Sequence, residues 1–180
     1  ESVVEAAKKI NDHDRNINIL VNNAGVIHNK LFQLTKISEF KEVFEINFFN
    51  QVYFVQLLLR NMIKSKNGSI IFLSSSSASD GNIGRSVYSS SKAALVAFSK
   101  VLSREVGNYK IRVNSISPGL TDTQMMEKST DKDYLTNIIK EIPLKRIGDP
   151  SDVSNLILFL ASDLSHYITG QDLRIDGGLK

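Results

Sequence analysis

The chain of 180 residues contains no cysteine. A disulfide framework, a thiolate metal site and a cysteine nucleophile are therefore excluded, and the composition is compatible with a reducing compartment. Glycine and proline are also few, at 10 and 3 residues, which excludes a collagen-like repeat. With 42% hydrophobic and 23% charged residues, the composition is typical of one globular domain.

Long hydrophobic runs are missing as well. Runs such as residues 156–161 are far shorter than the ~20 residues that a membrane-spanning helix needs, so we expect no membrane segment. Residues 1–5 do not show the basic stretch followed by an apolar stretch that marks a secretory signal. These features favour a cytoplasmic enzyme or binding domain.

Charge of one sign is not concentrated anywhere in the sequence. The chain has 22 Lys and Arg against 19 Asp and Glu, a net charge of +3, and the basic residues are scattered singly or in pairs. A nucleic-acid-binding surface usually shows a basic stripe with interleaved aromatics, so we expect a solvated surface and no nucleic-acid partner. The three histidines, His13, His28 and His166, lack metal-ligand spacing, and we expect no metal site.

Short β-branched runs alternate with longer helical patterns, which is typical of parallel βαβ units. The predicted strands are residues 17–21, 69–73, 111–116 and 172–175, and the predicted helices are residues 38–62, 86–106 and one that begins at 149–152. In that last helix, Asp149 is the expected cap and Pro150 occupies the first turn. Residues 121–146 have mixed polarity and are predicted to form a mobile lid with one or two small helices. The pattern predicts an α/β fold and a single domain over residues 1–180.

Tyr88 and Lys92 are four residues apart near the start of the second predicted helix, so they share one helix face. A nearby cation favours the phenolate form and lowers a phenol pKa from its usual value of ~10. Proton transfer near neutral pH then becomes feasible. The spacing alone is also consistent with an ordinary tyrosine beside a solvated lysine.

Small and polar residues follow three of the predicted strands. Asn22-Asn23-Ala24-Gly25 follows the first strand, Ser75 the second and Pro118-Gly119 the third. In an open parallel sheet the ligand crevice lies outside the carboxyl ends of the strands. The convergence of these residues predicts a ligand site there, although each alone could be a turn residue.

These motifs, in this order and spacing, resemble the classical short-chain dehydrogenases/reductases. The resemblance is carried by Leu20 through Gly25, Asn47, Ser75, Tyr88 through Lys92, Asn114 through Gly119 and Tyr167 through Gly178. It extends over essentially the whole chain. Residues 146–153 and 159–163 are most similar to 3-oxoacyl-[acyl-carrier-protein] reductases, but sugar, polyol and steroid dehydrogenases share these late motifs.

The resemblance implies a role for each matching residue. Tyr88 would be the general acid in carbonyl reduction, Lys92 would lower its pKa and hold the nicotinamide ribose, and Ser75 would hydrogen-bond the substrate oxygen. Asn47 would position a water that completes a proton relay through Lys92. The residues expected to contact the cofactor are Asn23, Ala24, Gly25, Tyr88, Lys92, Pro118, Gly119, Thr121 and Thr123. Gln124, Met125 and Met126, with Ser75, would shape the substrate pocket.

The sequence lacks the Gly-rich Thr-Gly-x-x-x-Gly-x-Gly turn with which the family begins, and it opens instead in a segment that the family places before its fourth strand. We therefore expect strands four to seven of a doubly wound Rossmann-type sheet, in a fragment whose adenosine-binding half is missing. The edge of strand 17–21 would then have no partner. The residues that choose NAD or NADP follow the absent second strand, and we favour NADP.

The expected activity is hydride transfer between NAD(P) and a carbonyl or secondary alcohol, with 3-oxoacyl-carrier reduction in fatty acid biosynthesis favoured. The alternatives are a sugar, polyol or other secondary-alcohol dehydrogenase, or an inactive fragment with an oligomerisation or binding role. The resemblance also implies a homodimer or homotetramer. An acidic acyl carrier protein would dock on basic residues near the active-site entrance, and Lys66 occupies one such position.

Overall fold

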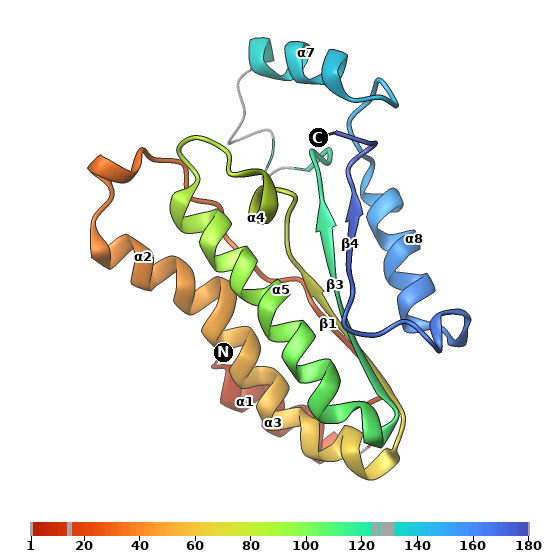
Figure 1. Ribbon diagram of the computed structural model, residues 1–180. Helices are drawn as coiled ribbons and strands as arrows, with labels where there is room; N and C mark the ends of the chain where they lie inside the picture. Colours follow the sequence, from red (N-terminus) through yellow and green to blue (C-terminus); the bar gives the residue numbers. More distant parts are fainter. Residues whose placement is uncertain (1, 14–15, 124–125, 127–131, 180) are drawn as a thin grey trace.

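A parallel sheet of four strands forms the centre of the computed structural model, which describes residues 2–13, 16–123, 126 and 132–179 (Figure 1). The strands are β1 (Ile19–Asn22), β2 (Gly68–Leu73), β3 (Ile111–Pro118) and β4 (Asp172–Ile175). They are paired in the order β1-β2-β3-β4, and every pair is parallel. The predicted parallel sheet is confirmed, with strand ends shifted by two residues at most.

Helices cover both faces of this sheet. The helices are α1 (Val3–His13), α2 (Ile37–Phe44), α3 (Asn50–Ser65), α4 (Ser77–Asp80), α5 (Ser86–Val106), α7 (Lys132–Glu141) and α8 (Pro150–Ala161). Helices α3 and α5 lie on one face with α1 packed against α3, and α8 lies on the other face (Figure 1). No helix among the described residues is both long enough and apolar enough to cross a bilayer.

The alternation of side chains along β2 separates two apolar cores. Ile70 and Phe72 pack with the side chains of α3 and α5, whereas Ile71 and Leu73 pack against α8. All six residues of β2 are buried, because helices cover both of its faces. This burial explains why the strand reads in the sequence as a continuous apolar run.

The helix predicted over residues 38–62 is two helices joined by a π-helical turn, η2 (Glu45–Phe49). The single-helix prediction was therefore wrong in detail. Within the turn, the fully buried Asn47 makes two hydrogen bonds to the backbone of Val26 on a neighbouring loop. A wider turn re-aims a side chain without ending the helix, and the hydrophobic periodicity does not reveal it.

The start of α8 matches the sequence prediction. Asp149 is the N-cap, and its carboxylate accepts a hydrogen bond from the backbone N–H of Ser151 at 2.8 Å. The carboxylate of Asp152 accepts a hydrogen bond from the N–H of Asp149 at 2.8 Å. The guanidinium of Arg146 donates one hydrogen bond to each oxygen of the same carboxylate. The two carboxylates thus pair the backbone N–H groups of Asp149 and Ser151 at the start of the helix.

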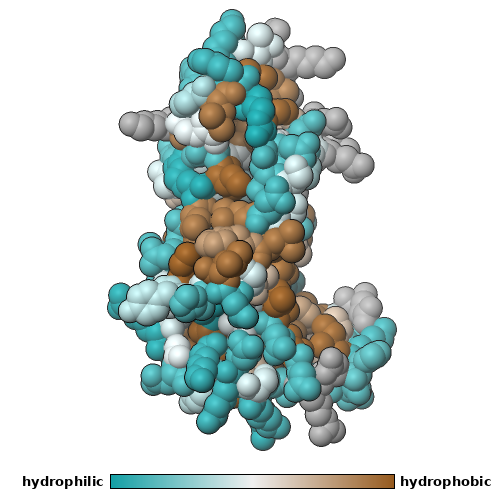
Figure 2. All heavy atoms as spheres, turned by 90° about the vertical axis from the view of Figure 1, so that its right-hand side faces the viewer, coloured by the Kyte–Doolittle hydropathy of each residue, from teal (hydrophilic) through white to brown (hydrophobic). Residues whose placement is uncertain are grey.

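Strand β1 lies at the edge of the sheet and is not covered on the α8 side. The register places Ile19 beside Ser69 and Val21 beside Ile71, so both face the α8 layer. Their exposed fractions are nevertheless 52% and 37%. Figure 2, which views the molecule from the α8 side, shows apolar side chains gathered across the middle of this face. An open apolar edge of this kind favours self-association.

We expect Ile19→Lys to reduce concentration-dependent association of the purified chain, because a charge on an exposed edge strand disfavours edge-to-edge pairing. The free energy of unfolding should change by no more than about 0.5 kcal/mol, since the side chain is half exposed. Sedimentation velocity and urea denaturation measure the two effects. The control is Ile71→Val in the buried core, which should cost about 0.5 to 1.5 kcal/mol and leave association unchanged. Equal association of wild type and Ile19→Lys would contradict this explanation.

Candidate active site

A cavity of about 710 Å³ opens at the carboxyl ends of the strands, between the ends of β1, β2 and β3, α5 and the start of α8. Eleven of the residues predicted from the sequence line it, namely Asn23, Ala24, Gly25, Ser75, Tyr88, Lys92, Pro118, Gly119, Thr121, Thr123 and Met126. The cavity thus brings together the predicted cofactor-contacting residues and every predicted catalytic residue except Asn47. Gln124 and Met125 lie outside the described residues.

Ser75 is held at the end of β2 by backbone pairing that continues beyond the strand. The N–H of Ser74 donates to the carbonyl of Ile116 at 2.8 Å, and the N–H of Ser76 donates to that of Pro118 at 2.8 Å. The hydroxyl of Ser75 accepts a hydrogen bond from the N–H of Ser77 at 3.2 Å, in the first turn of α4. These bonds fix the serine beside the neighbouring strand end.

Tyr88 lies in the first turn of α5 and is 9% exposed. Burial raises the pKa of its phenol, because removal from water disfavours the phenolate. A hydrogen bond with Ser75 and the positive charge of Arg85 act in the opposite direction. The net pKa lies above the usual value, so the lowered phenol pKa expected from Lys92 is not present in this structure.

Lys92 lies one helical turn beyond Tyr88 and is 4% exposed. Its ammonium donates to the carbonyl of Leu73 at 2.7 Å, and its nitrogen is 6.0 Å from the centre of the Tyr88 ring. Burial lowers the pKa of Lys92 to about 8. The side chain is therefore tied to the end of β2, and it is easier to deprotonate than an exposed lysine.

Asn47 does not line the cavity but lies directly behind it. Its Oδ1 accepts from the N–H of Val26 at 2.8 Å, and its Nδ2 donates to the carbonyl of Val26 at 2.9 Å and to the hydroxyl of Ser91 at 3.0 Å. Both amide hydrogens are thus used, while one lone pair of Oδ1 is available to a further donor. A methyl group added to Gly25 would lie 3.4 Å from this oxygen.

Two glycines at the cavity permit close approach to the backbone. A Cβ on Gly25 would lie 3.1 Å from the ammonium nitrogen of Lys92. A Cβ on Gly119 would lie 2.7 Å from the Cβ of Asp176, which is too close for any side chain. Position 119 therefore requires glycine, whereas a side chain at position 25 would have to displace the end of Lys92.

Sequence reasoning missed several cavity residues. Arg85, which precedes α5, lines the cavity, as do Pro150, Val153, Ser154 and Ile157 on α8. The position of Arg85 three residues before Tyr88 could have indicated it, because both then face the same helix side. The α8 residues gave no signal, since only the packing of that helix on the sheet brings them to the cavity.

The expected location of Lys66 near the entrance was wrong for a single copy of the chain. Lys66 follows α3 and precedes β2, whereas Ser75 follows β2. The cavity lies at the carboxyl ends of the parallel strands, and Lys66 lies at the amino end of β2. The full length of β2 therefore separates Lys66 from the cavity. The expectation for Lys66 came from the family resemblance, whereas the predicted strand 69–73 between Lys66 and Ser75 already implied this separation.

Comparisons with known proteins agree with the fold and the motifs. The sheet is the C-terminal part of a doubly wound Rossmann-type fold. The family model described as Enoyl-(Acyl carrier protein) reductase matches residues 1–180, and the chain belongs to the short-chain dehydrogenase/reductase family of oxidoreductases.

Three relatives illustrate this likeness, and each is named a 3-oxoacyl-[acyl-carrier-protein] reductase. The protein of Chlamydia pneumoniae is 39% identical over 98% of this chain and 71% of its own length. That of Thermotoga maritima is 38% identical over 99% of this chain and 72% of its own length. That of Vibrio cholerae is 34% identical over 99% of this chain and 73% of its own length. The chain corresponds to the C-terminal part of these relatives.

The lowered pKa of Lys92 predicts a pH dependence of stability. Its folded value of about 8 lies below the ordinary value of 10.5, so the unfolded state binds the additional proton between these values. The free energy of unfolding should therefore rise with pH across this window because of Lys92. We expect the difference between wild type and Lys92→Met to approach a slope of about 1 kcal/mol per pH unit. Urea denaturation from pH 7 to 10.5 measures it, and parallel curves would contradict the burial of a charged Lys92.

Proposed function

We propose that this chain carries the catalytic site of an NAD(P)-dependent reductase that acts on the 3-oxo group of an acyl thioester. The observation that carries the proposal is the convergence of Ser75, Tyr88 and Lys92 on one cavity at the carboxyl edge of the sheet. The names of the relatives support the 3-oxoacyl substrate and an acyl carrier protein as its carrier.

In the proposed reaction Tyr88 is the general acid. Its raised pKa keeps the phenol protonated at neutral pH, as a proton donor to a carbonyl oxygen requires. Ser75, which lines the cavity together with Tyr88, would donate to the same substrate oxygen and stabilise the negative charge that develops on it. The hydride would be supplied by a reduced nicotinamide cofactor when it is bound.

Proton return to Tyr88 would involve the buried groups behind the cavity. Lys92, with a pKa of about 8, can release a proton near neutral pH more readily than an exposed lysine. Asn47 lies behind Gly25, and the free lone pair of its Oδ1 can hold a water that resupplies Lys92. The proposed relay therefore runs from this water through Lys92 to the phenol.

The described residues fit the nicotinamide half of such a cofactor. Gly25 leaves space directly against the Lys92 ammonium, a suitable donor for ribose hydroxyls. Asn23 and Ala24 line the same side of the cavity. On the opposite side, Pro118, Gly119, Thr121 and Thr123 present backbone and hydroxyl groups for the ring and its carboxamide. We favour NADP over NAD.

Two alternative functions remain open, one at the same site and one without turnover. A sugar, polyol or other secondary-alcohol dehydrogenase would use Ser75, Tyr88 and Lys92 in the reverse direction, with Tyr88 as the base. A chain without turnover would act through association, for which the exposed apolar residues Phe49 of η2, Tyr53 of α3 and Val101 of α5 offer a surface. We propose a homodimer or homotetramer in either case.

Cofactor binding separates an enzyme from an association module. Because the sequence contains no tryptophan, the emission of NADPH or NADH can be followed without interference from indole. We expect enhanced nicotinamide emission on titration of the purified chain and a weaker response for Gly25→Val, whose side chain would press on Lys92. No response to either cofactor would favour the association role.

We expect Tyr88→Phe to reduce the rate of acetoacetyl-thioester reduction about 100- to 10,000-fold while cofactor binding is retained, because only the proton donor is lost. NADPH oxidation at 340 nm measures the rate. The matched control is Tyr167→Phe, since Tyr167 is 94% exposed. A wild-type rate in Tyr88→Phe would overturn the assignment of the acid. Turnover of secondary alcohols but not of the thioester would favour the dehydrogenase alternative.

A further inference from the structure

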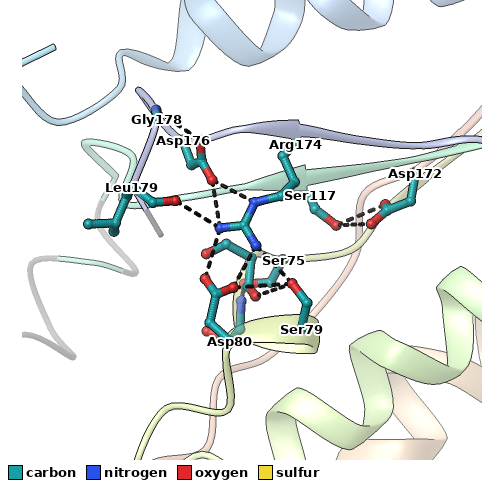
Figure 3. Close-up of polar contacts among 11 residues, drawn as sticks. Ser75, Ser79, Asp80, Ser117, Asp172, Arg174, Asp176, Gly178 and Leu179 are labelled. Carbon is teal, nitrogen blue, oxygen red and sulfur yellow. Dashed lines mark hydrogen bonds and ion pairs between the residues drawn. The ribbon is translucent and has the colours of Figure 1, made fainter. Parts of the chain in front are cut away.

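A cluster of charged side chains joins α4, β4 and the C-terminal turn beside the cavity (Figure 3). From β4, Arg174 donates to both carboxylate oxygens of Asp80 on α4, at 2.5 and 2.9 Å. Its Nε donates to Asp176 at 2.6 Å. The remaining donors reach the hydroxyl of Ser79 at 2.9 Å and the carbonyl of Leu179 at 3.1 Å.

All five N–H groups of the guanidinium are therefore engaged, which requires the planar fork of arginine. The side chains of Arg174, Asp80 and Asp176 are 34%, 24% and 10% exposed. Arg174 also holds the pKa of Asp80 below its usual value, so this carboxylate is ionised at neutral pH. A partly buried network with bidentate geometry fixes positions more firmly than an exposed ion pair does.

The cluster is connected to both sides of the candidate active site. Asp80 ends the short helix whose first turn bonds to the Ser75 hydroxyl, through the N–H of Ser77. Asp176 packs against Gly119 so closely that Gly119 has no space for a Cβ. Figure 3 shows the guanidinium between the α4 carboxylate and the C-terminal turn, with Ser75 next to α4.

We propose that Arg174 is a positioning residue: by binding Asp80 and Asp176 together, it holds α4 against β4 and so fixes the Ser75 hydroxyl, which accepts from Ser77, beside Tyr88 in the cavity. Without the guanidinium, the two carboxylates would repel each other and α4 would lose its tie to β4. The backbone of Ser75 would still be paired to β3, but its hydroxyl would no longer be fixed by α4. The catalytic part of this inference rests on the proposed reductase function.

The test follows the influence of the Ser75 hydroxyl on the Tyr88 phenol, without turnover. The chain is labelled with ¹³C at Cζ of tyrosine, Tyr88 is assigned through Tyr88→Phe, and its titration is followed by NMR. Since the hydrogen bond from Ser75 lowers the phenol pKa, its loss should move the Tyr88 titration to higher pH. We expect this upward shift in Arg174→Gln and in the milder Asp80→Asn, and a smaller shift in Asp80→Glu, which keeps the charge.

A double-mutant cycle shows whether the effect passes through Ser75. Ser75→Ala should itself raise the Tyr88 titration, and adding Asp80→Asn to it should produce no further shift. The matched control is Arg146→Gln, which breaks a comparable arginine fork on Asp152 and should leave the Tyr88 titration unchanged. An unshifted titration in both Arg174→Gln and Asp80→Asn, or shifts that add fully to that of Ser75→Ala, would overturn the proposal.

Kinetics separate this inference from the proposed function. If the chain reduces the acetoacetyl thioester, Asp80→Asn should lower kcat about tenfold or more with a smaller change in KM, because alignment rather than binding is lost. Unchanged kcat alongside a shifted titration would overturn the catalytic part of the proposal. If the wild-type chain has no reductase activity, the proposed function fails, while the Tyr88 titration still decides whether Arg174 positions Ser75.

Discussion

The candidate active site depends on the backbone pairing between β2 and β3. These two central strands are in register from Gly68 and Ile111 to Leu73 and Ile116, and hydrogen bonds from Ser74 and Ser76 extend the pairing beyond the strand end. Both strands are buried between helical layers. Without this pairing, their backbone N–H groups would have no hydrogen-bond partner, because water does not reach them. The pairing therefore fixes the ends of the strands, and with them the groups that face the cavity.

Burial determines the chemistry of the groups held there. The phenol of Tyr88 and the ammonium of Lys92 are both removed from water, and in each case the charged form is disfavoured. Burial thus moves the two pKa values apart: the phenol of Tyr88 stays protonated, and the ammonium of Lys92 becomes more acidic. Ser75 and Arg85 moderate this effect at the phenol, whereas burial alone sets the direction at the ammonium.

Helices cover the two faces of the sheet unequally. Helices α3 and α5 cover one face, whereas α8 packs on β2 and β3 and leaves Ile19 and Val21 of β1 exposed. The relatives are longer than this chain, which corresponds to about 71% to 73% of their length. The residues that we propose for the nicotinamide half of the cofactor line the cavity. The exposed face of β1 lies beside it, on the sheet edge away from β4.

Much of this protein follows from the sequence by itself, because the features concerned are local. Apolar runs bounded by small residues located the strands, the Asp149 cap located the start of α8, and the four-residue spacing placed Tyr88 and Lys92 on one helix face. The wider turn at Asn47 could not be predicted, since it depends on bonds to Val26 on another loop. Nor could the bond between Arg174 and Asp80, which joins residues 94 positions apart. Contacts between distant segments, and the burial that sets a pKa, exist only once the chain has packed, so the tertiary structure alone decided them.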